Sequence, residues 1–117
     1  MTVIGPRVHG YLDYLTVLVF LLAPSLLGLS GAAAVLAYLL AVVHLAMTLL
    51  TRFPMGFREV VPLALHGLVE VGVGVVLSLI GLLAFGGEAQ IFYMLVGLVI
   101  VLVWLLTDYR ASRSRDG

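Results

Sequence analysis

Histidine and carboxylate side chains lie inside stretches of this 117-residue sequence that are otherwise apolar. His9 is followed four residues later by Asp13, and His66 is followed four residues later by Glu70. Residues at this spacing lie one above the other on the same face of a helix. The carboxylate can therefore orient the imidazole of a metal ligand through a hydrogen bond, or the two buried groups can simply satisfy one another. His44 is a fifth polar group of this kind, apart from the two pairs.

The residue types favour a metal-ion site. Imidazole and carboxylate ligands suit zinc, iron, manganese or nickel, and the absence of cysteine argues against a dedicated Cu(I) site. We expect the histidines to be ligands and the carboxylates to be co-ligands, ring orienters or proton carriers. The predicted ligands are His9, His44 and His66, with Asp13 and Glu70 in the supporting roles. Such a site would belong to a binding protein or a transporter.

A haem b site is an alternative for the same histidines. Two histidines from facing helices can be the axial ligands of haem iron in a membrane bundle. The best pairs are His44 with His66 and His44 with His9. The propionates would need cationic partners at the edge of the membrane, and the candidates are Arg7, Arg52 and Arg58.

Two further functions could use this cluster. Chains of histidine and carboxylate relay protons in membranes, and Glu70 would then be the central carrier. An intramembrane hydrolase with a catalytic zinc ranks last, because the chain is short and shows no nucleophile arrangement. We therefore predict no catalytic residue and expect a non-enzyme.

The composition indicates a lipid bilayer. Hydrophobic residues make up 63% and charged residues 10% of the sequence, whereas an ordinary soluble domain is about 45–50% apolar and about 25% charged. Six arginines and six acidic residues cannot provide a water-soluble shell, which excludes a soluble enzyme and a disordered tail. The formal net charge is zero, so no overall field attracts nucleic acid. Because cysteine and lysine are absent, disulfide, thiolate and Schiff-base chemistry are excluded as well.

The apolar stretches that carry the polar residues are long enough to be membrane spans. A helix needs about 20 predominantly apolar residues to cross about 30 Å of hydrocarbon, and none of the stretches alternates with the period of a membrane strand. We therefore expect an all-α polytopic membrane protein whose residues 1–117 form one four-helix transmembrane domain, with no extramembrane domain. The predicted spans are residues 8–29, 32–51, 60–83 and 89–107.

The arginines predict the orientation of these spans. All six lie on one side: before the first span, between the second and third, and after the fourth. Because positive charges accumulate on the cytoplasmic side, we expect both termini in the cytoplasm and a multi-pass protein of the cytoplasmic (inner) membrane. Arg7, Arg52 and Arg58 would lie at the cytoplasmic interface.

The polar residues would fall in the same half of the bilayer. From a rise of 1.5 Å per residue, His44 and His66 lie roughly 10 Å from the cytoplasmic ends of their spans, and Glu70 lies about one turn deeper. His9 lies near the edge, with Asp13 a turn deeper. Three different spans therefore direct polar groups toward one level.

Small residues share faces with these polar groups. Glycines recur every seven residues in the third predicted span, and two alanines lie on the face of His44 in the second. Small residues let membrane helices approach closely, so we expect these faces to pack the helices. The same faces could pair two copies of the chain as a homodimer. The predicted packing residues are Gly67, Gly74, Gly81, Ala37 and Ala41.

The two halves of the chain are similar in sequence. The pattern His-Gly-x-x-acid opens the first span at His9 and the third span at His66, shortly after a proline in each case. Thr51 and Thr107 close the second and fourth spans, where a threonine is expected to cap the helix or bond backward to a carbonyl. We therefore expect an internal repeat of two similar hairpins, related by an axis near the membrane normal.

The first half also carries a family resemblance. Residues 13–31 resemble the SPW-repeat membrane proteins, whose two-helix units start at an Asp-aromatic pair and carry a Ser-Pro-Trp motif near the outer end of the first helix. Here Ala23, Pro24 and Ser25 stand at the motif, so that only the proline matches, and residues 79–82 of the second half lack it. The resemblance implies a small bacterial four-span protein with a structural or accessory role that is undefined. It transfers no functional residue.

Overall fold

The computed structural model describes residues 3–51 and 61–107. As the sequence predicts, the described chain is all-α, with four helices that are each long and apolar enough to cross a membrane. The helices are α1 (Pro6–Leu27), α2 (Gly31–Leu50), α3 (Leu63–Ala84) and α4 (Gly87–Leu106).

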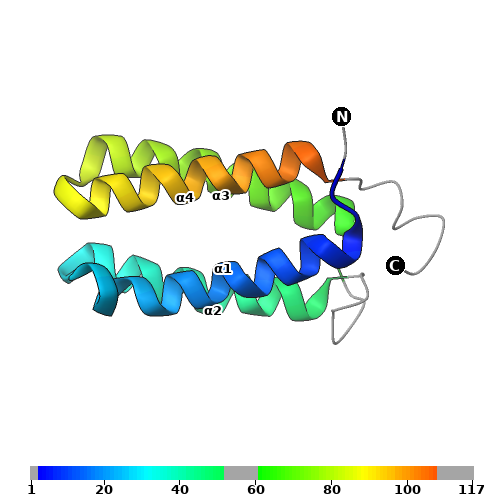
Figure 1. Cartoon of the computed structure of the whole chain (residues 1–117), viewed down its shortest axis with the longest axis horizontal. Helices are drawn as coiled ribbons and strands as arrows, with labels where there is room; N and C mark the ends of the chain where they lie inside the picture. The colour runs from blue at the N-terminus through cyan, green and yellow to red at the C-terminus, as the bar shows by residue number, and fades with distance from the viewer. Residues whose placement is uncertain (1–2, 52–60, 108–117) are drawn as a thin grey trace.

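The four helices form two antiparallel hairpins, α1 with α2 and α3 with α4 (Figure 1). The tight turns of both hairpins lie at one end of the bundle. At the other end, the residues before each odd-numbered helix bond to the end of a helix in the opposite hairpin. The Ile4 N–H donates to the Leu106 carbonyl (2.9 Å), and the Val61 N–H donates to the Leu50 carbonyl (2.7 Å). This end is therefore held together across the two hairpins.

The helix ends differ from the predicted spans by at most three residues, for local reasons. α1 begins two residues early, at Pro6, because proline has no N–H to leave unpaired in the first turn. α3 begins three residues late because Pro62 keeps an extended backbone before Leu63, and a residue that precedes a proline is disfavoured from the helical region. α1 ends two residues early at Gly28, whose φ of 67° lets its N–H return to the Pro24 carbonyl.

The exterior of the bundle is apolar, while part of its interior is polar. Leu83, Leu26 and Val42 are 79%, 76% and 65% exposed, and large apolar side chains face outward on all four helices. An apolar surface of this extent is a liability in water and suits the hydrocarbon of a membrane. The buried side chains, by contrast, include three histidines, two carboxylates and three threonines.

Glycines allow α3 and α4 to approach closely. A Cβ atom on Gly74 would lie 2.9 Å from the carbonyl oxygen of Gly97, and a Cβ atom on Gly97 would lie 2.6 Å from the carbonyl oxygen of Gly74. A Cβ atom on Gly81 would lie 3.0 Å from the Met94 backbone nitrogen. The other small residues expected to pack, Gly67, Ala37 and Ala41, are buried as well.

Aromatic side chains fill the middle of the bundle between the hairpins. The rings of Phe20 and Phe92 meet edge to face with centroids 6.1 Å apart. The Tyr93 hydroxyl donates to the Ala33 carbonyl at 2.6 Å, which joins α4 to α2 near the turns. These contacts separate the turn end of the bundle from the polar end.

Candidate metal centre

Two histidines and two carboxylates meet in the interior near the polar end. His9 and Asp13 come from α1, and His66 and Glu70 come from α3. All four side chains are buried. One potential ligand atom from each side chain lies within 4.8 Å of the corresponding atoms of the other three. The i, i+4 spacing places each pair on the inward face of its helix. Because α1 and α3 start at the same end of the bundle, the two pairs also meet at matching levels.

Each histidine lies closer to the carboxylate of the other hairpin than to its own. His9 Nε2 is 2.9 Å from Glu70 Oε2 and 3.2 Å from Asp13 Oδ2. His66 Nε2 is 2.9 Å from Asp13 Oδ2 and 3.2 Å from Glu70 Oε2. A tetrahedral zinc with ligands about 2.0–2.1 Å away would separate neighbouring ligands by roughly 3.3–3.4 Å. The four separations are 0.1–0.5 Å shorter than this and lie in the range of hydrogen bonds, so a bound metal would need the ligand atoms to move slightly apart.

A threonine hydroxyl lies at hydrogen-bond distance from the Nδ1 atom of each of these two imidazoles. His9 Nδ1 is 2.8 Å from Thr107 Oγ1, and His66 Nδ1 is 2.5 Å from Thr51 Oγ1. Each threonine hydroxyl already donates its single proton to a carbonyl in the preceding turn, Val103 for Thr107 and Met47 for Thr51. The hydroxyl oxygen must therefore accept from the ring, which assigns the proton to Nδ1 of both histidines. In the neutral imidazole, Nε2 then carries the lone pair that a metal would bind.

The role of the two threonines in the centre goes beyond what the sequence predicted. The expected backward bonds to carbonyls are present. The contacts with histidine join residues 98 and 15 positions apart, so spacing along one helix could not reveal them. The signal that could have found them is the placement of Thr51 and Thr107 at equivalent helix ends, each beside the start of an odd-numbered helix.

The charge of the centre requires two compensating positive charges. Asp13 and Glu70 are buried, and burying uncompensated carboxylates is costly. Among the described residues, the single arginine is Arg7, which is exposed in the first turn of α1. Arg52 and Arg58, also expected at the interface, lie outside the described residues. The carboxylates can be balanced by one divalent cation with neutral imidazoles or by two protonated imidazoles.

His44 lies beside the four-atom set rather than within it. Its Nε2 is 3.4 Å from Asp13 Oδ1 and 3.5 Å from Glu70 Oε1, whereas the contacts given above for His9 and His66 are with Asp13 Oδ2 and Glu70 Oε2. The structure thus brings all five predicted polar residues together, but it gives His44 a different position from the other two histidines. A direct bond from His44 to a metal in the four-atom site stays a prediction.

The described part of the centre leaves no room for a haem between the histidines. In both predicted axial pairs, His44 with His66 and His44 with His9, the Nε2 atoms face the Asp13 and Glu70 carboxylates at 2.9–3.5 Å, where the porphyrin would have to lie. The cavity that adjoins His44, His66 and Glu70 measures about 30 Å³, which is about the volume of one water molecule. The donor set therefore fits a single metal ion better than a macrocycle.

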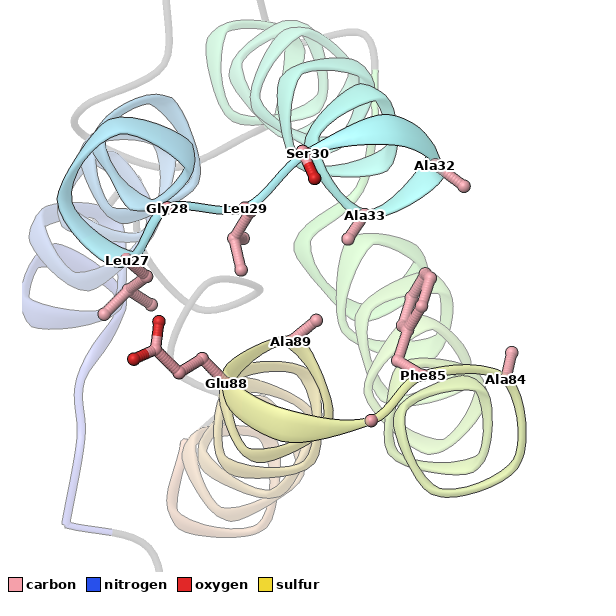
Figure 2. Close-up of a pocket in the computed structure, with 11 residues that line it drawn as sticks. Leu27, Gly28, Leu29, Ser30, Ala32, Ala33, Ala84, Phe85, Glu88 and Ala89 are labelled. Atoms are coloured by element: carbon pink, nitrogen blue, oxygen red, sulfur yellow. The ribbon is translucent and has the colours of Figure 1, made fainter.

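A larger cavity lies at the opposite end of the bundle, between the two turns. Its volume is about 500 Å³, and Figure 2 shows residues of both turns around it, including Ser30, Phe85 and Glu88. Glu88 is the one acidic side chain in this lining, which contains no histidine. The cavity therefore offers no second set of metal ligands.

Comparison with known proteins found no matching family model, no matching curated protein and no matching solved structure. The resemblance to the SPW-repeat proteins consequently stays a prediction.

Proposed function

We propose that this protein is an integral membrane protein that binds one divalent transition-metal ion. The ligands are His9 Nε2, His66 Nε2 and one oxygen each of Asp13 and Glu70. The observation that carries the proposal is the convergence of these four buried atoms within 4.8 Å. The threonine behind each imidazole supports it, because metal-binding histidines characteristically donate their second ring N–H to an oxygen acceptor.

Zinc is the first choice for this donor set, followed by iron and manganese. Two imidazole nitrogens and two carboxylate oxygens form a donor set that suits zinc. A divalent ion also balances the two buried carboxylates and leaves the centre neutral. With no thiolate in the chain, a Cu(I) site is disfavoured.

The same proposal includes the environment in which the metal is held. The six arginines on one side of the spans favour cytoplasmic termini in a bacterial inner membrane. Two similar hairpins are supported by the helix bounds, since α1 and α3 each have 22 residues and α2 and α4 each have 20. The centre would lie at the cytoplasmic side, where the metal joins the hairpins. The molecular mass of the purified protein tests whether two copies associate.

The decisive experiment is the metal content of tag-free protein purified in detergent, measured by elemental mass spectrometry together with its molecular mass. We expect one metal ion per chain. Asp13→Asn should abolish binding, because it removes a ligand and leaves the loaded centre with an uncompensated charge. Glu88→Gln is the matched control, since Glu88 is an exposed carboxylate outside the centre, and its metal content should equal that of the wild type.

Wild-type protein that holds no stoichiometric metal, even after supplementation, would overturn the proposal. The imidazoles would then have to carry the compensating protons, and the cluster would be a structural or proton-handling element. Glu70→Gln would separate these two roles, because only a proton-handling element loses a pH-dependent response while its unfolding temperature is kept.

A further inference from the structure

The bundle has two seams at which one hairpin meets the other, and the protein fills them unequally. At the seam between α2 and α3, the cavity beside His44 measures about 30 Å³. At the seam between α1 and α4, the two helices line a groove of about 260 Å³. Protein interiors contain few voids larger than a water molecule. The α1–α4 groove therefore has room for an occupant from outside the bundle.

The lining of the α1–α4 groove disfavours water as that occupant. Thr16 is the one lining residue with a polar side chain, and its hydroxyl already donates to the Leu12 carbonyl at 2.8 Å. The other lining residues are leucine, valine and isoleucine. A hollow of this kind stays dry and takes up apolar molecules, because an enclosed water needs polar partners. The groove is therefore suited to a hydrocarbon group.

The α1–α4 groove opens sideways, where a bilayer would surround the helices. Ile100 at its base is 4% exposed, whereas Leu15 on α1 and Val99 on α4 are 55% and 54% exposed. A second hollow of about 340 Å³ shares Leu15 with the groove and continues along α1 to Leu27. From Leu12 to Leu27, the two hollows extend roughly 22 Å at 1.5 Å per residue. This length fits within the about 30 Å of hydrocarbon in a bilayer.

The α1–α4 groove suits a thin, flexible chain better than a helix of a second copy. Helices that pack together in membranes approach through small residues, and the groove is lined by neither glycine nor alanine. A helix is also about 10–12 Å across with its side chains, so it could insert only single side chains here. A lipid acyl chain needs no small residues and carries no polar backbone.

We propose that the α1–α4 groove is a lipid-binding site that holds one acyl chain of a membrane phospholipid between the two hairpins. The acyl chain contacts α1 on one side and α4 on the other, and it thereby packs the hairpins together within the membrane. Because it binds the folded bundle and not the unfolded chain, it stabilises the fold. The inference rests on the membrane location in the proposed function but not on the metal.

The test is the amount of phospholipid that stays with the detergent-solubilised protein after exhaustive detergent exchange, measured as phosphorus per chain. The wild type should retain one phospholipid per chain, and its unfolding temperature should fall when a harsher detergent removes that lipid. In Val99→Phe, the larger side chain should fill the groove from α4, so that no phospholipid is retained. Val19→Phe fills the groove from α1 and provides the same test if Val99→Phe fails to fold.

Trp104 allows a second measurement of the same site. It is the single tryptophan of the chain, and it lies one helical turn beyond Ile100 on the same side of α4. A phospholipid with brominated acyl chains should therefore quench Trp104 fluorescence when it occupies the groove. Quenching in the wild type should require several-fold less of this lipid than quenching in Val99→Phe.

Val42→Phe is the matched control. Val42 is 65% exposed on α2 and does not line the groove. The variant thus makes the same change of side chain elsewhere on the apolar exterior. Its retained phospholipid and its quenching should equal those of the wild type.

Several results would overturn the lipid site. Wild-type protein that loses all its phospholipid without a change in unfolding temperature would show that the groove holds no lipid. Equal retention in the wild type, Val99→Phe and Val19→Phe would place the retained lipid elsewhere. A dimer without bound phospholipid that Val99→Phe converts to a monomer would make a second copy the occupant. Protein without bound metal would refute the proposed metal binding alone, so the two failures are distinguishable.

Discussion

In His9 and in His66, the two ring nitrogens have different partners. In His9, Nδ1 meets the Thr107 hydroxyl and Nε2 faces the carboxylates, and His66 repeats this arrangement with Thr51. The orientation of the rings is thus set by groups from the opposite hairpin. A threonine hydroxyl that can only accept a hydrogen bond from Nδ1 fixes the tautomer of the histidine. Removing that hydroxyl should therefore lower metal affinity more than it lowers the stability of the fold.

Thr107→Val should test this selection. Valine keeps the shape of threonine but leaves the His9 Nδ1–H without its acceptor, so we expect metal affinity to fall by about 10–100-fold. Thr107→Ser, which keeps the hydroxyl, should restore most of the affinity. Metal titrations of the three proteins in detergent measure the effect. Equal affinities for the valine and serine variants would contradict the assigned role.

The two histidine–carboxylate pairs could be predicted from the sequence because a spacing of four residues concerns one helix only. The closest partners could not be predicted. His9 lies nearer to Glu70 than to Asp13, which depends on how α1 and α3 face each other. The distinct place of His44 has the same cause, since its contacts are all with other helices. Local periodicity gives the face of a residue, and tertiary packing gives its neighbours.

At the level of the helices, the apolar length predicted all four elements, while prolines and a left-handed glycine shifted their ends. The seven-residue spacing of glycines in α3 indicated a packing face but not its partner. That partner includes Gly97 of α4, whose carbonyl approaches Gly74. The contact needs a residue without a side chain on both α3 and α4. The spacing of glycines along α3 gives no information about which residue of α4 lies opposite.

Gly97→Ala should destabilise the α3–α4 hairpin. The added Cβ atom would clash with the Gly74 carbonyl oxygen and the Ser78 side chain, and the backbone oxygen cannot move away without a shift of the helix. We expect a loss of about 1–3 kcal/mol in the free energy of unfolding. Unfolding in mixed detergent micelles, followed by circular dichroism, would measure it.

Gly72→Ala is the matched control for this substitution. Gly72 is an exposed helical glycine of α3, and a Cβ atom there meets nothing within 4 Å. Its free energy of unfolding should change by less than about 1 kcal/mol, in the direction of greater stability. Equal losses for both variants would show that the close contact between α3 and α4 does not limit stability.

At the level of the whole molecule, composition and the lengths of the apolar stretches were sufficient to predict four helices that are each long and apolar enough to cross a membrane. How the two hairpins meet could not be derived in the same way. Their association depends on long-range contacts such as Tyr93 with Ala33 and Phe20 with Phe92. The arginine pattern predicts which end of this bundle faces the cytoplasm.

Cysteine labelling can test that orientation, because the chain has no cysteine of its own. Val3→Cys and Ser30→Cys place single thiols at exposed positions at opposite ends of the bundle. In intact bacterial cells, a membrane-impermeant maleimide should label the Ser30 variant, while the Val3 variant should react only after the membrane is opened. The reverse pattern would place the termini outside the cell and would contradict the proposed orientation.

The crossed contacts of the metal centre also bear on how the protein is made. Translation delivers the first hairpin before the second, so α1 and α2 leave the ribosome before His66, Glu70 and Thr107 do. A lone charged side chain at membrane depth costs about 2.5–3.5 kcal/mol by insertion measurements. The nascent first hairpin is therefore an unfinished structure, with His9 and Asp13 turned toward partners still in the ribosome. A chain that terminates after α2 would still contain two apolar helices long enough to enter a membrane. It would leave His9 and Asp13 without the partners from the second hairpin, and we expect cellular quality control to degrade it.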